Sequence, residues 1–205
     1  MKKIMFNDKY GLTQAVLEGR KTQTRRIIKC QKTFNGSYVS GFRVLTNSLG
    51  ERFTYLVDED EIELEGSYLK PAYEIGEEVA VSQSYHDAKK EVGGLKGLLE
   101  GHPLPSSKGI NNKMFVKADL MPHRIRITNV RMERLQDISV EDCSKEGVEK
   151  LKWEHSNEFY YMTKATPHRY NLAKDAFASL IDKTCGKGTW ERNPWVFVYD
   201  FELVK

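Results

Sequence analysis

The sequence predicts an α+β fold in which a twisted, closed β-barrel carries flanking helices and long loop insertions. Several short segments alternate apolar and polar residues, and the clearest of them runs from Trp195 to Leu203. Only a few segments carry apolar residues at helical spacing, and turn residues separate the elements. Short strands with few helices between them are typical of barrels. The chain of 205 residues is long enough for one such domain with insertions.

The first element is expected to be a helix that starts near Tyr10, with Asn7 or Asp8 as its cap. Its buried stripe consists of Leu12, Ala15, Val16 and Gly19. Gly19 suits the left-handed position that follows a helix. Residues 19–26 should therefore leave the helix as a loop, and a strand should start at Arg26.

The region from residue 37 to residue 112 is predicted to contain strands and one long excursion. Residues 37–57 have the alternation of a β-hairpin with a turn at 47–50, and the acidic run 58–65 fits a solvated loop or edge. A strand should cover 78–82. Residues 86–112 are poor in apolar side chains and rich in Gly and Pro, which predicts a surface excursion. A lid, a binding loop and a simple insertion all fit that segment.

Residues 114–116 and 125–135 should be extended. In 125–135 the apolar positions change from odd to even numbers, which predicts a bulge near Thr128-Asn129. With this bulge, three arginines share the opposite face: Arg124, Arg126 and Arg131. Such a row is either a solvated charged face or a contact for a nucleic-acid backbone.

Two helices and a turn are expected in the last third of the chain. Ser139 should cap a helix that has Val140 and Cys143 facing inward and ends at Gly147. Residues 149–170 show no clear period. The second helix should start at Asn171, and its apolar stripe is Leu172, Ala173, Ala176, Phe177, Leu180 and Ile181. Residues 186–189 resemble part of a phosphate loop but follow a helix, so they are expected to form a turn.

The composition narrows the classes of function. No apolar run approaches the ~18 residues of a membrane span and no signal-peptide core is present, so the protein is expected to be cytoplasmic with no membrane partner. The cysteines Cys30, Cys143 and Cys185 are expected to be reduced and mostly buried. The histidines lack metal-ligand spacing, so no metal site is expected. No cofactor is expected either. The net charge of +3 does not by itself imply a nucleic-acid partner.

Residues 19–26 form the densest chemical cluster, with four cations and two threonines. A solvated basic loop, an anion-binding loop and a catalytic lysine–hydroxyl pair all fit this segment. Glu146 lies in the last turn of the 139–147 helix, where the helix dipole disfavours a carboxylate. A cation should therefore lie nearby, and Lys145, Lys150 and Lys21 are the candidates.

The pattern Gly19-x-Lys21-x-x-x-x-Arg26 resembles the GxKxxxxR signature of the ASCH family, which are small β-barrels similar to PUA domains. Thr22 and Thr24 fit the family's GRKTxTxR form. Further blocks resemble the larger members that phages and prophages often carry: 125–135, 135–139, 141–142, 146–147, 186–190 and 193–196. The resemblance implies a single PUA-like domain over 1–205 with insertions at about 30–75 and 86–113. At Ser82-Gln83-Ser84-Tyr85 many relatives carry Trp-Val-Arg-Glu instead, which puts a ligand contact there in doubt.

The resemblance implies a cleft for RNA or a modified nucleoside. One bacterial branch hydrolyses the acetyl amide of N4-acetylcytidine with a lysine, a threonine and a glutamate, which correspond to Lys21, Thr24 and Glu146. Thr24 would attack the acyl carbon with Lys21 as its base, provided that the pKa of Lys21 is lowered. Arg20, Arg25 and Arg26 should lower that pKa, and Glu146 should raise it.

Three hypotheses follow. The first is a module that binds RNA or a nucleoside, with Lys21, Arg26 and the Arg124/Arg126/Arg131 face as anion contacts and Arg20 and Arg25 as supporting charges. The second is an amidohydrolase of acylated nucleosides that uses Lys21, Thr24 and Glu146. The third and weakest is a phage accessory protein that contacts host proteins.

Overall fold

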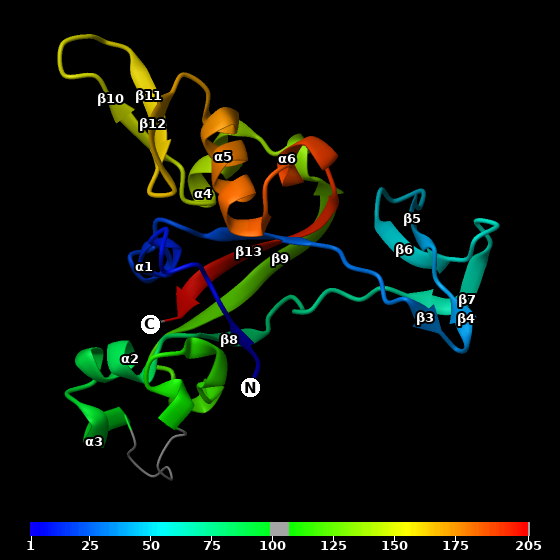
Figure 1. The fold of residues 1–205 in the computed structure, drawn as a ribbon, viewed down its shortest axis with the longest axis horizontal. Coiled ribbons are helices and arrows are strands. Elements are labelled where there is room, and N and C mark those ends of the chain that lie inside the picture. Colours follow the sequence, from blue (N-terminus) through cyan, green and yellow to red (C-terminus); the bar gives the residue numbers. More distant parts are fainter. Residues whose placement is uncertain (99–106, 205) are drawn as a thin grey trace.

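The fold is built around one five-stranded sheet, seen in a computed structural model that describes residues 1–98 and 107–204 (Figure 1). Its order is β1 (Lys3–Ile4), β8 (Glu78–Val81), β9 (Arg124–Arg134), β13 (Trp195–Val204) and β2 (Gln23–Ile27). β1 runs parallel to β8, and the other pairs are antiparallel.

The predicted α+β class is confirmed, but the described residues form no closed barrel. β1 and β2 are the two edges of the central sheet and do not pair with each other. Closure requires hydrogen bonds between the edge strands along their length. β1 has only two residues, so it offers too few backbone groups for such a seam.

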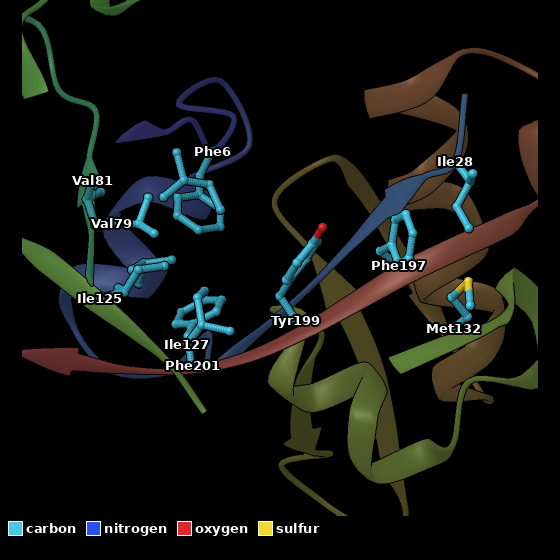
Figure 2. Close-up of a cluster of buried hydrophobic side chains, with 12 residues drawn as sticks. Phe6, Ile28, Val79, Val81, Ile125, Ile127, Met132, Phe197, Tyr199 and Phe201 are labelled. Atoms are coloured by element: carbon cyan, nitrogen blue, oxygen red, sulfur yellow. The ribbon is translucent and has the colours of Figure 1, made fainter. Parts of the chain in front are cut away.

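The alternation predicted for the last strand is confirmed, and it separates two hydrophobic cores. Phe197, Tyr199 and Phe201 belong to the first core, together with Phe6 and residues of β8 and β9 (Figure 2). Val196 and Val198 point to the second core, on the opposite face. The helices α4 (Val140–Lys145) and α5 (Ala173–Cys185) cover that second face.

The bulge predicted in β9 is confirmed at Thr128. Asp200 of β13 pairs with Asn129, whereas the next residue, Phe201, pairs with Ile127. Thr128 is therefore the extra residue, and it lets both halves of β9 face the first core. Ile125 and Ile127 are fully buried on one side of the bulge, and Met132 is buried on the other.

We expect deletion of Thr128 to prevent folding, whereas Thr128→Ala should be tolerated. Without the extra residue, a continuous β9 would turn either Ile125 and Ile127 or Met132 away from the first core. Truncation of a buried isoleucine to alanine typically lowers the free energy of unfolding by about 2–5 kcal/mol. The loss of two such side chains from the core therefore approaches the total stability of a domain. Urea denaturation of the soluble fraction measures this, and a deletion variant as stable as the parent would contradict it.

The N-terminal helix differs from its prediction at the start but not at the end. α1 (Leu12–Leu17) begins after Gly11, which has φ of 66°, so neither Asn7 nor Asp8 is its cap. The carboxylate of Asp8 instead accepts a hydrogen bond from the Thr13 hydroxyl at 2.5 Å. Gly19 has φ of 73°, as its left-handed role requires. β2 then begins at Gln23, so the expectation that residues 19–26 are all loop is wrong for the second half.

The C-terminal helices follow their predicted stripes with two corrections. Ser139 caps α4, because its hydroxyl accepts from the backbone N–H of Asp142 at 3.0 Å. Cys143 is buried, whereas Val140 is exposed and was wrongly expected to face inward. Leu172 is likewise exposed, because α5 begins one residue after it. The turn predicted at 186–189 ends one residue early, because Thr189 begins the short helix α6 (Thr189–Arg192).

Two small sheets, with a separate short hairpin, extend from the central sheet. Residues 30–75 contain the strands β3 (Thr33–Phe34), β4 (Ser37–Tyr38), β5 (Gly41–Thr46), β6 (Arg52–Val57) and β7 (Glu63–Tyr68). The predicted hairpin is the β5–β6 pair, and the end of the acidic run enters β7, an edge strand. The second sheet was missed because its sequence has no clear period, and its strands are β10 (Glu149–Lys152), β11 (Phe159–Thr163) and β12 (Thr166–Tyr170).

The excursion predicted between β8 and β9 is largely helical. The whole segment between these strands contains α2 (Tyr85–Glu91), α3 (Leu95–Leu98) and the 3-10 turns η1 (Ser107–Gly109), η2 (Lys113–Phe115) and η3 (Ala118–Leu120). A fourth 3-10 turn, η4 (Leu135–Asp137), follows β9. These helices share a small core that includes Tyr85 and Leu98. The expectation of extended structure at 114–116 is therefore wrong. Part of the predicted excursion, 99–106, lies outside the described residues.

Two remaining predictions concern the surface. Cys30 and Cys185 are exposed and only Cys143 is buried, so the expectation of mostly buried thiols is wrong. Across the described ranges, no helix combines the length and the apolar character needed to cross a bilayer.

Candidate functional site

The candidate site is a pocket of about 540 Å³ at the free edge of β2. The segment 5–9 and the C-terminal half of α5 also contribute to its wall. Five of the predicted site residues line it: Lys21, Thr24, Arg25, Arg26 and Glu146.

Backbone hydrogen bonds bring Lys21 to Glu146 across 125 positions of sequence. The N–H of Lys21 donates to the carbonyl of Ala15 at 2.9 Å, in the turn that Gly19 permits. The N–H of Thr22 then donates to the carbonyl of Lys145 at 3.0 Å. These bonds hold the start of β2 against the end of α4. The cation that compensates Glu146 at this helix end is therefore Lys21.

The amine of Lys21 is buried and surrounded by three acceptors. Its side chain is 2% exposed. Nζ lies 2.5 Å from Oε2 of Glu146, 2.9 Å from the carbonyl oxygen of Glu146 and 2.7 Å from that of Gln23. Three acceptors match the three N–H groups of an ammonium. Loss of one proton would leave two N–H groups and a lone pair on Nζ.

Burial lowers the pKa of Lys21, and this outweighs the opposing effect of Glu146. Desolvation is the largest cause, and the nearby charges of Arg26 and Arg25 act in the same direction. Attraction and hydrogen bonding to Glu146 raise the pKa of Lys21 but do not restore its usual value. The conflict between the arginines and Glu146 that the sequence left open is thus decided mainly by burial. A buried lysine with a lowered pKa at a pocket wall is typical of functional sites.

Arg25 fixes the second oxygen of Glu146. Its Nη1 lies 3.0 Å from Oε1 of Glu146. On its other side, Arg25 contacts Glu133 at 2.6 Å and Asp142 at 3.2 Å, and its side chain is 1% exposed. Both carboxylate oxygens of Glu146 are therefore held, one by Lys21 and one by Arg25. The guanidinium of Arg25 thus contacts three carboxylates. Arg25 therefore acts here as a positioning group for Glu146.

Thr24 completes the set without a bond to either partner. It is buried in β2, opposite Tyr199 of β13, and it lines the same pocket as Lys21 and Glu146. Its hydroxyl makes no hydrogen bond to another residue in the described ranges. Lys21 precedes the strand and Thr24 lies in it, so the two side chains share the pocket although they are three positions apart.

The other predicted arginines do not line the pocket, and each forms salt bridges with carboxylates. Arg20 is on the surface, where it contacts Glu18 and Glu149. Arg124 and Arg126 both contact Glu78, and Arg126 also contacts Glu202.

Arg131 belongs to the same charge network as Arg25. It contacts Asp200 at 2.6 Å, Asp142 at 2.7 Å and Glu133 at 3.1 Å. With Arg124 and Arg126 also paired, every arginine of the predicted charged face has at least one carboxylate partner.

Phe6, Lys9 and Lys113 also line the pocket, and no local pattern along the chain predicted them. Nζ of Lys113 lies 2.7 Å from Oδ1 of Asp8 and also donates to the carbonyl of Phe6. Lys113 comes from η2, inside the segment expected to be an insertion, so this segment helps to fix the 5–9 wall. Only the folded chain brings η2 to residues more than a hundred positions earlier.

A larger hollow of about 820 Å³ lies between the β5–β7 sheet and strands β9 and β13. Its wall includes Phe53, Tyr68 and Phe197, but it contains none of Lys21, Thr24 and Glu146. We therefore place the candidate chemistry in the smaller pocket, where the buried lysine and glutamate meet.

Comparisons of the chain with protein-family models, with curated proteins and with solved structures found no match. Among the residues that the structure describes, no group of three or more His, Cys, Asp and Glu side chains is placed to hold a metal ion.

Proposed function

We propose that this protein hydrolyses the amide of an N-acylated pyrimidine nucleoside of the N4-acetylcytidine type. The observation that carries the proposal is the buried Lys21–Glu146 pair, joined at 2.5 Å in the wall of a pocket that Thr24 also lines. A buried ion pair costs desolvation energy and is weak support for stability alone. A module that only binds would need the cations but neither the hydroxyl nor the carboxylate.

The chemistry assigns one role to each side chain. Neutral Lys21 accepts the proton of the Thr24 hydroxyl while Oγ forms a bond to the acyl carbon. The bond from that carbon to the nucleoside nitrogen then breaks, and the nitrogen leaves as an amine with the proton held by Lys21. Water next cleaves the ester on Thr24, which releases the carboxylic acid and restores the hydroxyl. Glu146 orients Lys21 throughout, because Arg25 holds its other oxygen.

The test incubates the protein with N4-acetylcytidine and follows the release of cytidine and acetate. Lys21→Ala and Thr24→Ala serve as inactive variants, and Lys29→Ala, which removes an exposed lysine outside the pocket, serves as the matched control. The proposal is supported if the parent and the control release cytidine and acetate and the two inactive variants do not. Equal release by Lys21→Ala would refute the assignment of Lys21.

The rate should rise with pH. The base is the neutral form of Lys21, and burial lowers the pKa of this group. The rising limb of kcat/KM should therefore have its midpoint below the pKa of a free lysine, about 10.4. A pH series with N4-acetylcytidine measures this. A rate that falls as pH rises in this range would instead mean that the ammonium form works, by polarising the acyl oxygen.

The second candidate is a module that binds RNA or a nucleoside in the same pocket without turnover. The observation that favours it is the unbonded Thr24 hydroxyl, which has no hydrogen bond to Lys21 among the described residues. Binding of cytidine or RNA without release of acetate would support this candidate. Membership of the ASCH family and a PUA-like relationship of the sheet belong to the same proposal, and the signature at residues 19–26 supports them. We also propose a cytoplasmic location.

A further inference from the structure

The pocket holds two cations that the Lys21–Glu146 chemistry does not use. Lys21 and Arg25 are paired with Glu146, and Lys113 is paired with Asp8. Lys9 and Arg26 also line the pocket, and neither forms a salt bridge within the part of the chain that the structure describes. The acidic side chains of the wall are thus already matched by other cations.

The described residues satisfy the guanidinium of Arg26 only in part. One of its terminal nitrogens, Nη2, donates to the carbonyl of Met5 at 2.7 Å. Its Nε is buried and has no hydrogen-bond partner among the described residues. An unsatisfied buried N–H of a guanidinium is costly and calls for an explanation such as a ligand. The guanidinium carbon lies 5.7 Å from the centre of the Phe6 ring, which helps to hold it in the pocket.

Lys9 lies on the same wall, in the segment that Lys113 fixes. Its side chain is exposed, and its Nζ is 5.7 Å from the centre of the Tyr10 ring. An exposed lysine is free to turn toward an anion in the pocket. Arginine and lysine are the usual ligands of phosphate oxygens, the first through its planar fork and the second as a point charge.

We infer that Lys9 and Arg26 form a phosphate subsite, so that the ligand of this pocket is a nucleotide rather than a free nucleoside. A nucleoside is neutral and offers no anion to Lys9 and Arg26. The phosphate is either that of a mononucleotide or a phosphodiester of an RNA chain. The substrate class rests on the proposed function, but the subsite itself requires only binding.

The binding test compares cytidine 5′-monophosphate with cytidine by calorimetry at low salt. The monophosphate should bind about tenfold more tightly or better, because hydrogen bonds to charged groups contribute this much. Lys9→Ala combined with Arg26→Gln should remove the preference, and Lys9→Ala alone should reduce it. Lys29→Ala and Arg169→Gln, which remove cations outside the pocket, should preserve it. Equal affinity of the parent for both ligands, or a preference that survives the double variant, would overturn the inference.

The turnover test separates this inference from the proposed function. N4-acetylcytidine, its 5′-monophosphate and a short RNA that contains the same base are compared as substrates. Faster turnover of the monophosphate or of the RNA supports the subsite and identifies the source of the phosphate. Turnover of all three at one rate overturns the subsite and leaves the hydrolase intact. Preferred binding of the monophosphate with no turnover overturns the hydrolase and leaves the subsite.

Discussion

Replacement of Lys21 with methionine is expected to lower the free energy of unfolding by about 3–5 kcal/mol and to abolish deacylation. The change leaves the Glu146 carboxylate buried, with one oxygen no longer held by an ammonium. Removal of one partner of a buried pair is far more costly than removal of both. Arg25 still contacts the other oxygen of Glu146, which places the expected loss toward the lower end of the range.

The double variant Lys21→Met/Glu146→Gln separates stability from activity. It removes both charges, so it should recover much of the stability lost in Lys21→Met while remaining inactive. Urea denaturation and the acetate assay measure the two quantities. Lys90→Met, which breaks an exposed pair with Asp87, is the matched control and should cost less than about 1 kcal/mol. Full activity of the double variant would show that the pair is structural only.

Replacement of Thr24 with valine is expected to reduce kcat/KM at least about a thousandfold with little change in stability, because the nucleophile is lost. The hydroxyl of Thr24 makes no hydrogen bond to a described residue, so its removal should leave no partner unsatisfied. The shape of the side chain stays nearly the same. We expect the free energy of unfolding to change by less than about 1 kcal/mol.

Two further variants define the role of the Thr24 hydroxyl. Thr24→Ser keeps a nucleophile and should retain measurable activity, with an acetyl group trapped on residue 24 detectable by mass spectrometry. Thr22→Val changes a neighbouring threonine that does not line the pocket. This variant should have the same deacylation activity as the parent. An active Thr24→Val enzyme would show that water attacks the acyl carbon directly and that Thr24 only shapes the pocket.

The sequence alone predicted the elements whose signal is local. The two faces of β13 and the bulge at Thr128 follow from the order of apolar and polar residues along each strand. Ser139 and Gly147 mark the ends of α4, because caps depend on a few adjacent residues. Where the local period was weak, as in β10–β12 and the helices of 85–120, the prediction failed.

The sequence also predicted a site at Lys21 and Thr24, through a compact signature, but it left the partner of Glu146 open among three lysines. Only the tertiary structure shows that this partner is Lys21. It also shows that Arg131 is paired with carboxylates and that Lys113 contacts the segment that forms the pocket wall. It also left β1 and β2 as open edges instead of closing a barrel. The physical reason is that periodicity and capping act over a few residues, whereas desolvation and ion pairing depend on distances between segments more than a hundred positions apart.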